Sequence, residues 1–288
     1  MLNEKEKSEL LNIKTLINFN IDLQREKNNK KSDYFISLLN ECLVICERLL
    51  NNKKVDGYNL HISDGTAKME FIRSLSTYQY INTNCKNFSK VDGSICKKCY
   101  ARKYIKLYTL DAFLIKNSLL LAYSDLSKKQ LENICLYNTM FFRFESFGDL
   151  LNERHLKNLL KICKYYKRTN FALFTKNVKI VKNVFETTKQ PKNLFMVFSS
   201  LMLNQQTNNF IKVNNMRIFT VYDKAHIESV DFNCEKKCIT CLKCYTKQNV
   251  IFINELLKWV VGGVSLHHQK VVNNGKYIFK KWYNINVK

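Results

Sequence analysis

Seven of the eleven cysteines in this chain fall into two groups whose spacing is typical of metal sites. The N-terminus is charged and lacks the apolar core of a signal peptide, which indicates a reducing, cytoplasmic setting where close cysteines are metal ligands rather than disulfides. The first group is Cys85, Cys96 and Cys99, and the second is Cys234, Cys238, Cys241 and Cys244. We therefore predict two metal sites.

The first group supplies only three thiolates, and this number matters chemically. A structural zinc site closes itself with four ligands, whereas a catalytic metal keeps one position open for substrate or water. A four-iron cluster normally takes four cysteines, so three would leave one iron free to bind another molecule. The alternative is a zinc site completed by a distant residue such as His61 or Cys135. The loop follows the first predicted strand, where active sites form, and this position favours the open site.

The second group places four soft ligands within eleven residues, in the pattern C-x3-C-x2-C-x2-C. Such a set can close a tetrahedral zinc site or hold an iron–sulfur cluster. Its first three cysteines match the C-x3-C-x2-C triad of radical S-adenosylmethionine enzymes, in which the rest of the barrel follows the triad. Only 44 residues follow Cys244, too few to build that barrel. The second group is therefore interpreted as structural zinc or an auxiliary cluster.

The elements that would position these cysteines alternate between strand and helix from Lys68 onward. Strands are predicted at Met69–Ser76, Thr139–Glu145, Asn170–Thr175, Asn193–Ser199, Met216–Tyr222 and Asn249–Ile253, and a strand-like tail includes Trp282. Helices are predicted at Ala101–Tyr137, Leu151–Tyr166, Val178–Thr188 and Glu255–Val261. This order is typical of parallel βαβ construction, and about six units predict an α/β fold, a barrel or partial barrel whose ligands gather at the carboxyl ends of the strands.

Residues 1–66 follow a different pattern and are predicted to form a helical extension. Their apolar residues recur at helical spacing, with a break at Asn28–Lys31. Cys42 and Cys46 lie four residues apart on the second helix, where we expect buried core positions rather than a metal site. The predicted domains are this extension, an α/β partial barrel over 67–225 with the first cysteine group, and a cysteine-rich metal-binding segment over 226–288.

The amino-acid composition suggests nucleic acid as a partner. The formal charge of +23 is what a protein that binds nucleic acid would carry, although AT-rich codon usage would also produce many lysines. An alternative function is thus a zinc-stabilised nucleic-acid-binding protein without catalysis. Its charged stacking surface would be Lys97, Lys98, Arg102, Lys103 and Lys106 with Tyr100, Tyr104 and Tyr108. No apolar run approaches the roughly 18 residues that a membrane span requires, so no membrane partner is expected.

Several short motifs, taken in order, resemble the bacteriophage gene product 88 family over about residues 67–255. They are Cys96-x2-Cys99-Tyr100-Ala101, Arg143–Asp149, Phe174–Asn177, Pro191–Leu194 leading into Phe198–Ser200, Cys241-x2-Cys244-Tyr245 and Val250–Phe252. The family shows a Cys-rich loop ending in CYA, an R-F/I-H-D-S-G-D-F segment, a Y-T-K motif and a C-terminal C-x2-C-W. It is similar, at a distance, to radical S-adenosylmethionine proteins.

The resemblance implies a partial (β/α)6 barrel and a [4Fe–4S] cluster on Cys85, Cys96 and Cys99. The unique iron would chelate the amine and carboxylate of S-adenosylmethionine, whose reductive cleavage supplies a 5′-deoxyadenosyl radical. This chain departs from the family where Glu145, Ser146 and Phe147 replace His, Asp and Ser, and where Tyr245 replaces Trp. The gap between Cys85 and Cys96 is also much longer than the three residues usual in radical enzymes.

Polar residues at the ends of the predicted strands are the candidates for binding this cofactor. A carboxylate could accept hydrogen bonds from the amine, glycine would allow close approach, and a cation with hydroxyls could hold a carboxylate or ribose. The candidates are Glu145, Gly148, Asp149, Thr175, Lys176 and Ser199. Asp149 could instead cap a helix that starts at Leu150. The sequence thus predicts an iron–sulfur, radical S-adenosylmethionine-like protein of phage or mobile-element type, with an unknown substrate.

Overall fold

The computed structural model describes residues 2–26, 30–99, 101, 108–247 and 251–257, and, for the backbone alone, four short strands beyond them. The helices are α1 (Glu4–Arg25), α2 (Lys30–Leu50), α3 (Thr83–Phe88), α5 (Tyr108–Tyr123), α6 (Lys128–Asn133), α7 (Glu153–Tyr165), α8 (Val178–Thr187) and α9 (Cys238–Cys241), with short 3-10 turns η1 (Ala67–Met69), η2 (Ile95–Lys98) and η3 (Lys224–His226). The strands are β1 (Arg73–Leu75), β2 (Phe141–Phe144), β3 (Asn170–Thr175), β4 (Leu194–Ser199), β5 (Met216–Tyr222), β6 (Phe252–Leu256), β7 (Val260–Val261), β8 (Val264–Ser265), β9 (His268–Asn273) and β10 (Lys276–Lys281).

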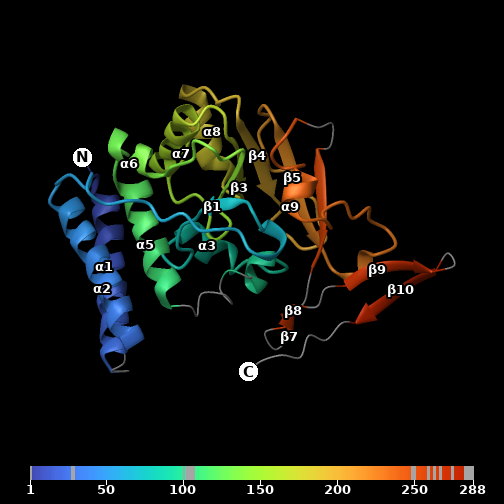
Figure 1. Cartoon of the computed structure of the whole chain (residues 1–288), viewed down its shortest axis with the longest axis horizontal. Coiled ribbons are helices and arrows are strands. Elements are labelled where there is room, and N and C mark those ends of the chain that lie inside the picture. The colour runs from blue at the N-terminus through green and yellow to red at the C-terminus, as the bar shows by residue number, and fades with distance from the viewer. Residues whose placement is uncertain are drawn as a thin grey trace.

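The centre of the molecule is a six-stranded sheet in the order β1-β2-β3-β4-β5-β6 (Figure 1). Every neighbouring pair is parallel, so all six carboxyl ends lie at one edge. Each strand pairs with the next strand along the chain, as parallel βαβ units do when they follow one another without a reversal. The predicted mixed α/β fold with a parallel sheet is therefore confirmed.

The two faces of the sheet carry different side chains. On β2, Phe142 and Phe144 are fully buried in the main core, where Phe144 stacks on Phe171 of β3 at 5.0 Å between ring centroids. Helices α5, α7 and α8 supply the other side of this core (Figure 1). Because successive side chains of a strand point to opposite faces, Phe141 and Arg143 point away from these helices. That second face holds the candidate site.

Two sequence predictions of helix were wrong. The helix predicted over Ala101–Tyr137 ends at Tyr123, and a new helix starts after Ser127, whose side chain and Gln130 form a capping box. Residues 102–107 lie outside the described structure. The segment predicted as helix over Glu255–Val261 begins in β6, which pairs with β5, because pairing with a neighbouring strand overrides a weak local preference for helix.

Strand boundaries also differ from the predictions at the ends of the sheet. The first strand is shorter than Met69–Ser76, because the chain forms a 3-10 turn at its start, with a left-handed backbone at Ala67 (φ 51°) and Phe71 (φ 68°). The strand predicted over Asn249–Ile253 is shifted to Phe252–Leu256, and Asn249 lies outside the described residues. In the tail, β9 and β10 form an antiparallel hairpin, and Trp282 lies outside the described residues.

The N-terminal extension is helical as predicted in α1 and α2, but residues 51–66, which were included in the prediction, contain no helix. Asn3 and Glu6 form a capping box at the start of α1, and α2 begins at Lys30, within the predicted break. Both helices contribute to the main core, including Cys42 and Cys46, whose predicted burial is confirmed. In the described part of the chain, no helix is long and apolar enough to cross a membrane.

Candidate functional site

A cavity with about 740 Å³ of empty space opens at the carboxyl edge of the sheet. It is lined by all three cysteines of the first group and by all six candidate cofactor-binding residues. The lining residues are Gln79, Cys85, Phe88, Cys96, Cys99, Ala101, Arg143, Glu145, Gly148, Asp149, Phe174, Thr175, Lys176, Ser199 and Phe219. Residues more than a hundred positions apart thus converge, because most of them sit on or just beyond strands of the same parallel sheet and the others belong to the long connection after β1.

The three cysteines reach the cavity from two short turns. Cys85 lies on α3, whose start is capped by the Asn82 side chain, and Cys96 lies on η2, where Ser94 Oγ accepts its backbone N–H at 3.0 Å. Burial raises the pKa of the Cys85 thiol well above its usual range, and the carboxylate of Asp149 adds to the effect. Burial also raises the pKa of Cys96, against the opposing charge of Lys176. Both groups are therefore neutral thiols in the metal-free protein at neutral pH.

The donor set fits a thiophilic metal with an open coordination position. Three thiols share one cavity wall, and thiolates are the ligands that zinc and iron–sulfur clusters prefer. Among the described residues, no three His, Cys, Asp or Glu side chains lie close enough to hold an ion as they stand, so binding requires the sulfurs to draw together. The suggested completing ligands lie elsewhere: His61 stacks on Phe113 at 4.0 Å between centroids, and Cys135 is exposed.

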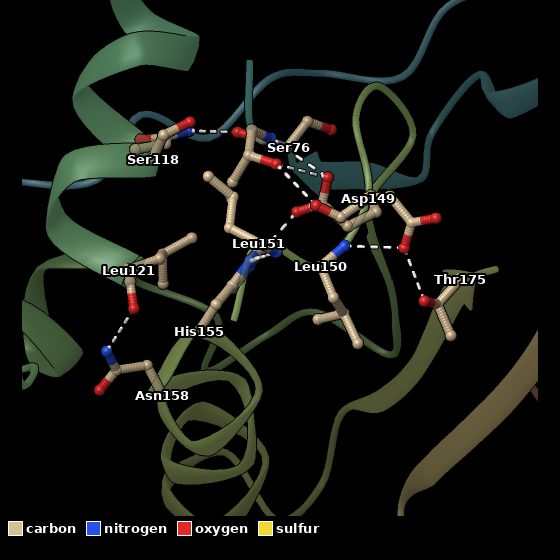
Figure 2. Close-up of polar contacts among 12 residues, drawn as sticks. Ser76, Ser118, Leu121, Asp149, Leu150, Leu151, His155, Asn158 and Thr175 are labelled. Atoms are coloured by element: carbon tan, nitrogen blue, oxygen red, sulfur yellow. Dashed lines mark hydrogen bonds and ion pairs between the residues drawn. The ribbon is translucent and has the colours of Figure 1, made fainter. Parts of the chain in front are cut away.

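Asp149 ties the loop after β2 to the end of β3. Its Oδ1 accepts hydrogen bonds from Thr175 Oγ1 at 2.6 Å and from Leu150 N at 2.7 Å (Figure 2). Its Oδ2 accepts from Lys176 N at 2.9 Å. The predicted alternative that Asp149 caps a helix starting at Leu150 is wrong. Helix α7 begins at Glu153, and Asn152 is its cap, because it is the Asn152 side chain that accepts the His155 N–H.

Glu145 has a backbone and a side chain that are both tightly constrained. Its φ of 55° lies in the left-handed region, which is uncommon for a residue with a Cβ. Its carboxylate is buried: Oε2 accepts from Thr77 Oγ1 at 2.8 Å, and Oε1 lies 3.3 Å from His155 Nε2. Burial raises the pKa of Glu145, although the contacts with His155 and Thr77 oppose this.

His155 connects this carboxylate to helix α7. Its Nδ1 accepts the Leu151 N–H at 3.2 Å (Figure 2). In the neutral ring the proton is therefore on Nε2, which lies 3.3 Å from Glu145 Oε1. The imidazole is fully buried. The contact between Glu145 and His155 therefore fixes the loop after β2 against helix α7.

Position 148 requires glycine because of its backbone angle and its close neighbours. Its φ is 80°, and a Cβ added there would lie 2.6 Å from Thr77 O and 2.8 Å from Glu145 Oε2. The close approach that we predicted for Gly148 is thus to the β1 loop of the protein itself. On the opposite side of the cavity, Lys176 Nζ donates to Ser199 Oγ at 2.9 Å, which places a cation and a hydroxyl together at the ends of β3 and β4.

Gln79 and the aromatic residues of the cavity were not predicted from the sequence. Gln79 belongs to the loop after β1, and Phe88, Phe174 and Phe219 supply apolar wall. The available signal for Gln79 was its position four residues beyond the first strand, where a polar residue faces the ligand edge. Single phenylalanines in a chain that contains 19 carry no such signal.

The second cysteine group lies in a compact segment around α9, which we call the knuckle, on the same face of the sheet. Cys238 and Cys241 bound α9, and the left-handed Leu242 (φ 51°) turns the chain toward Cys244. Cys238 and Cys244 pack with a small separate core, formed by the buried Ile72, Ala172 and Tyr245. The buried Arg217 of β5 holds the knuckle by donating to Lys243 O at 3.0 Å and to Thr246 O at 2.9 Å.

One sulfur of this group already contacts a cation. Lys68 Nζ donates to Cys234 Sγ at 3.1 Å and also forms an ion pair with Glu255. Burial raises the pKa of the Cys234 thiol to about 11, with Glu255 adding to the shift and Lys68 opposing it. A cation at a thiolate is the kind of neighbour that would compensate the charge of a four-thiolate metal site.

One residue, Phe174, contacts the surroundings of both cysteine groups. Phe174 lines the cavity of the first group and also packs against the core of the second. Arg143 lies over the Phe174 ring, with its guanidinium carbon 3.6 Å from the ring centroid. The part of the predicted tyrosine–lysine surface formed by Tyr100, Arg102, Lys103, Tyr104 and Lys106 lies outside the described residues.

Comparison with known proteins places this site within a family. The family model for Gene product 88 matches residues 50–256, which include both cysteine groups and all six strands of the sheet. Searches of curated proteins and of solved structures gave no match. The matched region covers most of the chain, and the protein therefore belongs to the Gene product 88 family.

Proposed function

We propose that this phage-type protein is an iron–sulfur enzyme of the radical S-adenosylmethionine type, acting in the host cytoplasm with its cofactors in the 740 Å³ cavity. The observation that carries the proposal is the convergence of three cysteines, an acid–hydroxyl network and a lysine in one cavity at the carboxyl ends of parallel strands. In parallel α/β folds this edge is where ligands bind. The sequential order of the six strands supports a partial barrel.

Each side chain has a role in this proposal. Cys85, Cys96 and Cys99 would hold a [4Fe–4S] cluster and leave one iron position open. The bound cluster and S-adenosylmethionine would supply one-electron, radical chemistry. Lys176 and Ser199, which are hydrogen-bonded to each other, would bind a carboxylate or ribose of the ligand.

The remaining candidates would position the loop rather than contact a ligand. The oxygens of Asp149 are engaged with Thr175, Leu150 and Lys176, and the carboxylate of Glu145 with Thr77 and His155. Gly148 makes room for this packing. We propose that the second cysteine group holds zinc or an auxiliary cluster and supports the shared Phe174 wall.

The test is metal and sulfide analysis of anaerobically purified protein, with EPR of the reduced form before and after adding S-adenosylmethionine. We expect iron with sulfide, and a cluster signal that changes with S-adenosylmethionine and disappears in Cys96→Ala. Cys135→Ala is the matched control, because Cys135 is exposed and does not line the cavity. Zinc at both groups, with no cluster signal after iron reconstitution, would refute the proposal and favour the zinc-stabilised nucleic-acid-binding alternative.

A further inference from the structure

Gln79 is a buried glutamine with an unsatisfied amide in the wall of the cavity. It is 2% exposed, and neither its Nε2 nor its Oε1 has a hydrogen-bond partner among the described residues. Two neighbours use their polar atoms within the protein: Thr77 donates to Glu145 Oε2, and Asn82 donates to Asp149 O at 2.8 Å while capping α3. Glu145 Oε1, which also lacks a hydrogen bond, lies 3.3 Å from His155 Nε2. Burying a donor and an acceptor without partners is unfavourable, so an unsatisfied amide at a cavity points to a ligand.

We propose that Gln79 recognises the donor–acceptor edge of an adenine base in the ligand of this cavity. A carboxamide presents an N–H donor and a carbonyl acceptor side by side in one plane. Adenine is complementary to it, because its amino group donates and its neighbouring ring nitrogen accepts. At the edge that carries N7, where adenine offers its amino N–H and N7, guanine presents two acceptors, O6 and N7, and would leave the Gln79 oxygen unpaired. The proposal is therefore that this edge of the base faces Gln79. The inference rests on the proposed function only in treating the cavity as a ligand site.

The rest of the cavity suits a nucleoside. It is open to solvent, so a ligand can enter it from outside. Phe88, Phe174 and Phe219 line it, and phenyl rings are surfaces on which planar bases stack. Lys176 and Ser199 lie in the same cavity for the polar remainder of the ligand. A nucleoside could stack its base on the phenyl rings and bind Lys176 with a polar group, so that it contacts both the apolar and the polar lining residues.

Contact with a base requires the Gln79 side chain to rotate toward the cavity, because its amide atoms are covered. This rotation breaks no hydrogen bond to any residue that the structure describes. The base would then supply both missing partners at once. Selectivity would arise because a polar site rejects analogues that leave its buried groups unpaired.

The test is isothermal titration calorimetry with adenosine, guanosine and S-adenosylmethionine as ligands. Each is titrated into the full-length protein in two forms, as purified anaerobically and after metal removal. Wild type should prefer adenosine to guanosine, and Gln79→Leu should bind adenosine on the order of ten- to a hundred-fold more weakly. Gln79→Met provides a second variant of similar length. Gln24→Leu is the matched control, because Gln24 is also a buried glutamine but lies on α1, outside the cavity. Circular dichroism of each variant checks folding.

The outcomes separate this inference from the proposed function. Adenosine binding that depends on Gln79 in metal-free protein supports the inference even if iron is never bound. An iron–sulfur protein that binds S-adenosylmethionine equally well in wild type and in Gln79→Met overturns the inference and leaves the proposed function standing. Failure of wild type to bind adenosine or S-adenosylmethionine in either form also overturns it.

Discussion

The two cysteine groups lie on the same face of one sheet but are built in opposite ways. The second is local, with four cysteines within eleven residues, a left-handed turn at Leu242 and a small apolar core beneath it. The first is dispersed over two turns and lines a cavity whose other walls come from distant strands. On this contrast we propose that the compact group serves folding, whereas the group spread around a cavity leaves room for a ligand.

The sharpest test of this contrast is to remove one cysteine from each group. If the second group holds a metal as proposed, Cys241→Ser should lower the free energy of unfolding by at least about 3 kcal/mol and release one equivalent of metal, because the binding energy of a closed four-thiolate site is folding energy. Cys96→Ser should change stability little and retain the metal of the second group. Urea unfolding with metal analysis measures both quantities, and equal losses of stability in the two variants would remove the distinction.

The loop beside the first group should be intolerant of any added side-chain atom. Gly148→Ala should cost about 2–4 kcal/mol, because alanine is strained at a φ of 80° and its Cβ would collide with Thr77 O. Gly57→Ala is the control, since a Cβ there would meet nothing within 4 Å. Thermal and urea unfolding of both variants check this, and a tolerated Gly148→Ala would show that the cavity loop is looser than the contacts indicate.

Metal uptake by the second group should depend on pH in a defined direction. The raised pKa of Cys234, about 11, means that its thiol is protonated between pH 6 and 8 and must release its proton to bind metal. Apparent zinc affinity should therefore rise with pH across this window, by about tenfold per unit for each proton released. Competition with a chromophoric chelator at several pH values measures the slope, and a flat profile would mean that the thiols are already ionised.

The smallest expected effect is a gain of stability in the first region. Gln79→Met removes an unpartnered buried amide from the cavity wall, so the ligand-free protein should be more stable by roughly 1 kcal/mol or less. Wild type and variant would be compared by urea unfolding without nucleoside. A loss of stability instead would mean that the Gln79 amide already has a partner in the folded chain.

Much of this arrangement followed from the sequence alone. The parallel strands are short apolar runs and the helices α7 and α8 are amphipathic, and the middle strands Asn170–Thr175 and Met216–Tyr222 were predicted with their observed limits. The cysteine groups and the polar residues beyond the strand ends were found because spacing within a few residues is a local property. Parallel strands place their carboxyl ends at one edge, so gathering these residues into one cavity followed as well.

Only the tertiary structure decided what each side chain contacts. Asp149 could have capped a helix, but its carboxylate bonds to Thr175 and Lys176, which are distant in sequence. The last strand, β6, forms where a helix was predicted to begin, because its neighbour β5 offers a pairing edge. Gln79 stood out only when its lack of partners could be seen. Spacing along the chain determines local turns and ligand sets, whereas hydrogen bonds, burial and pairing depend on neighbours that the fold brings together.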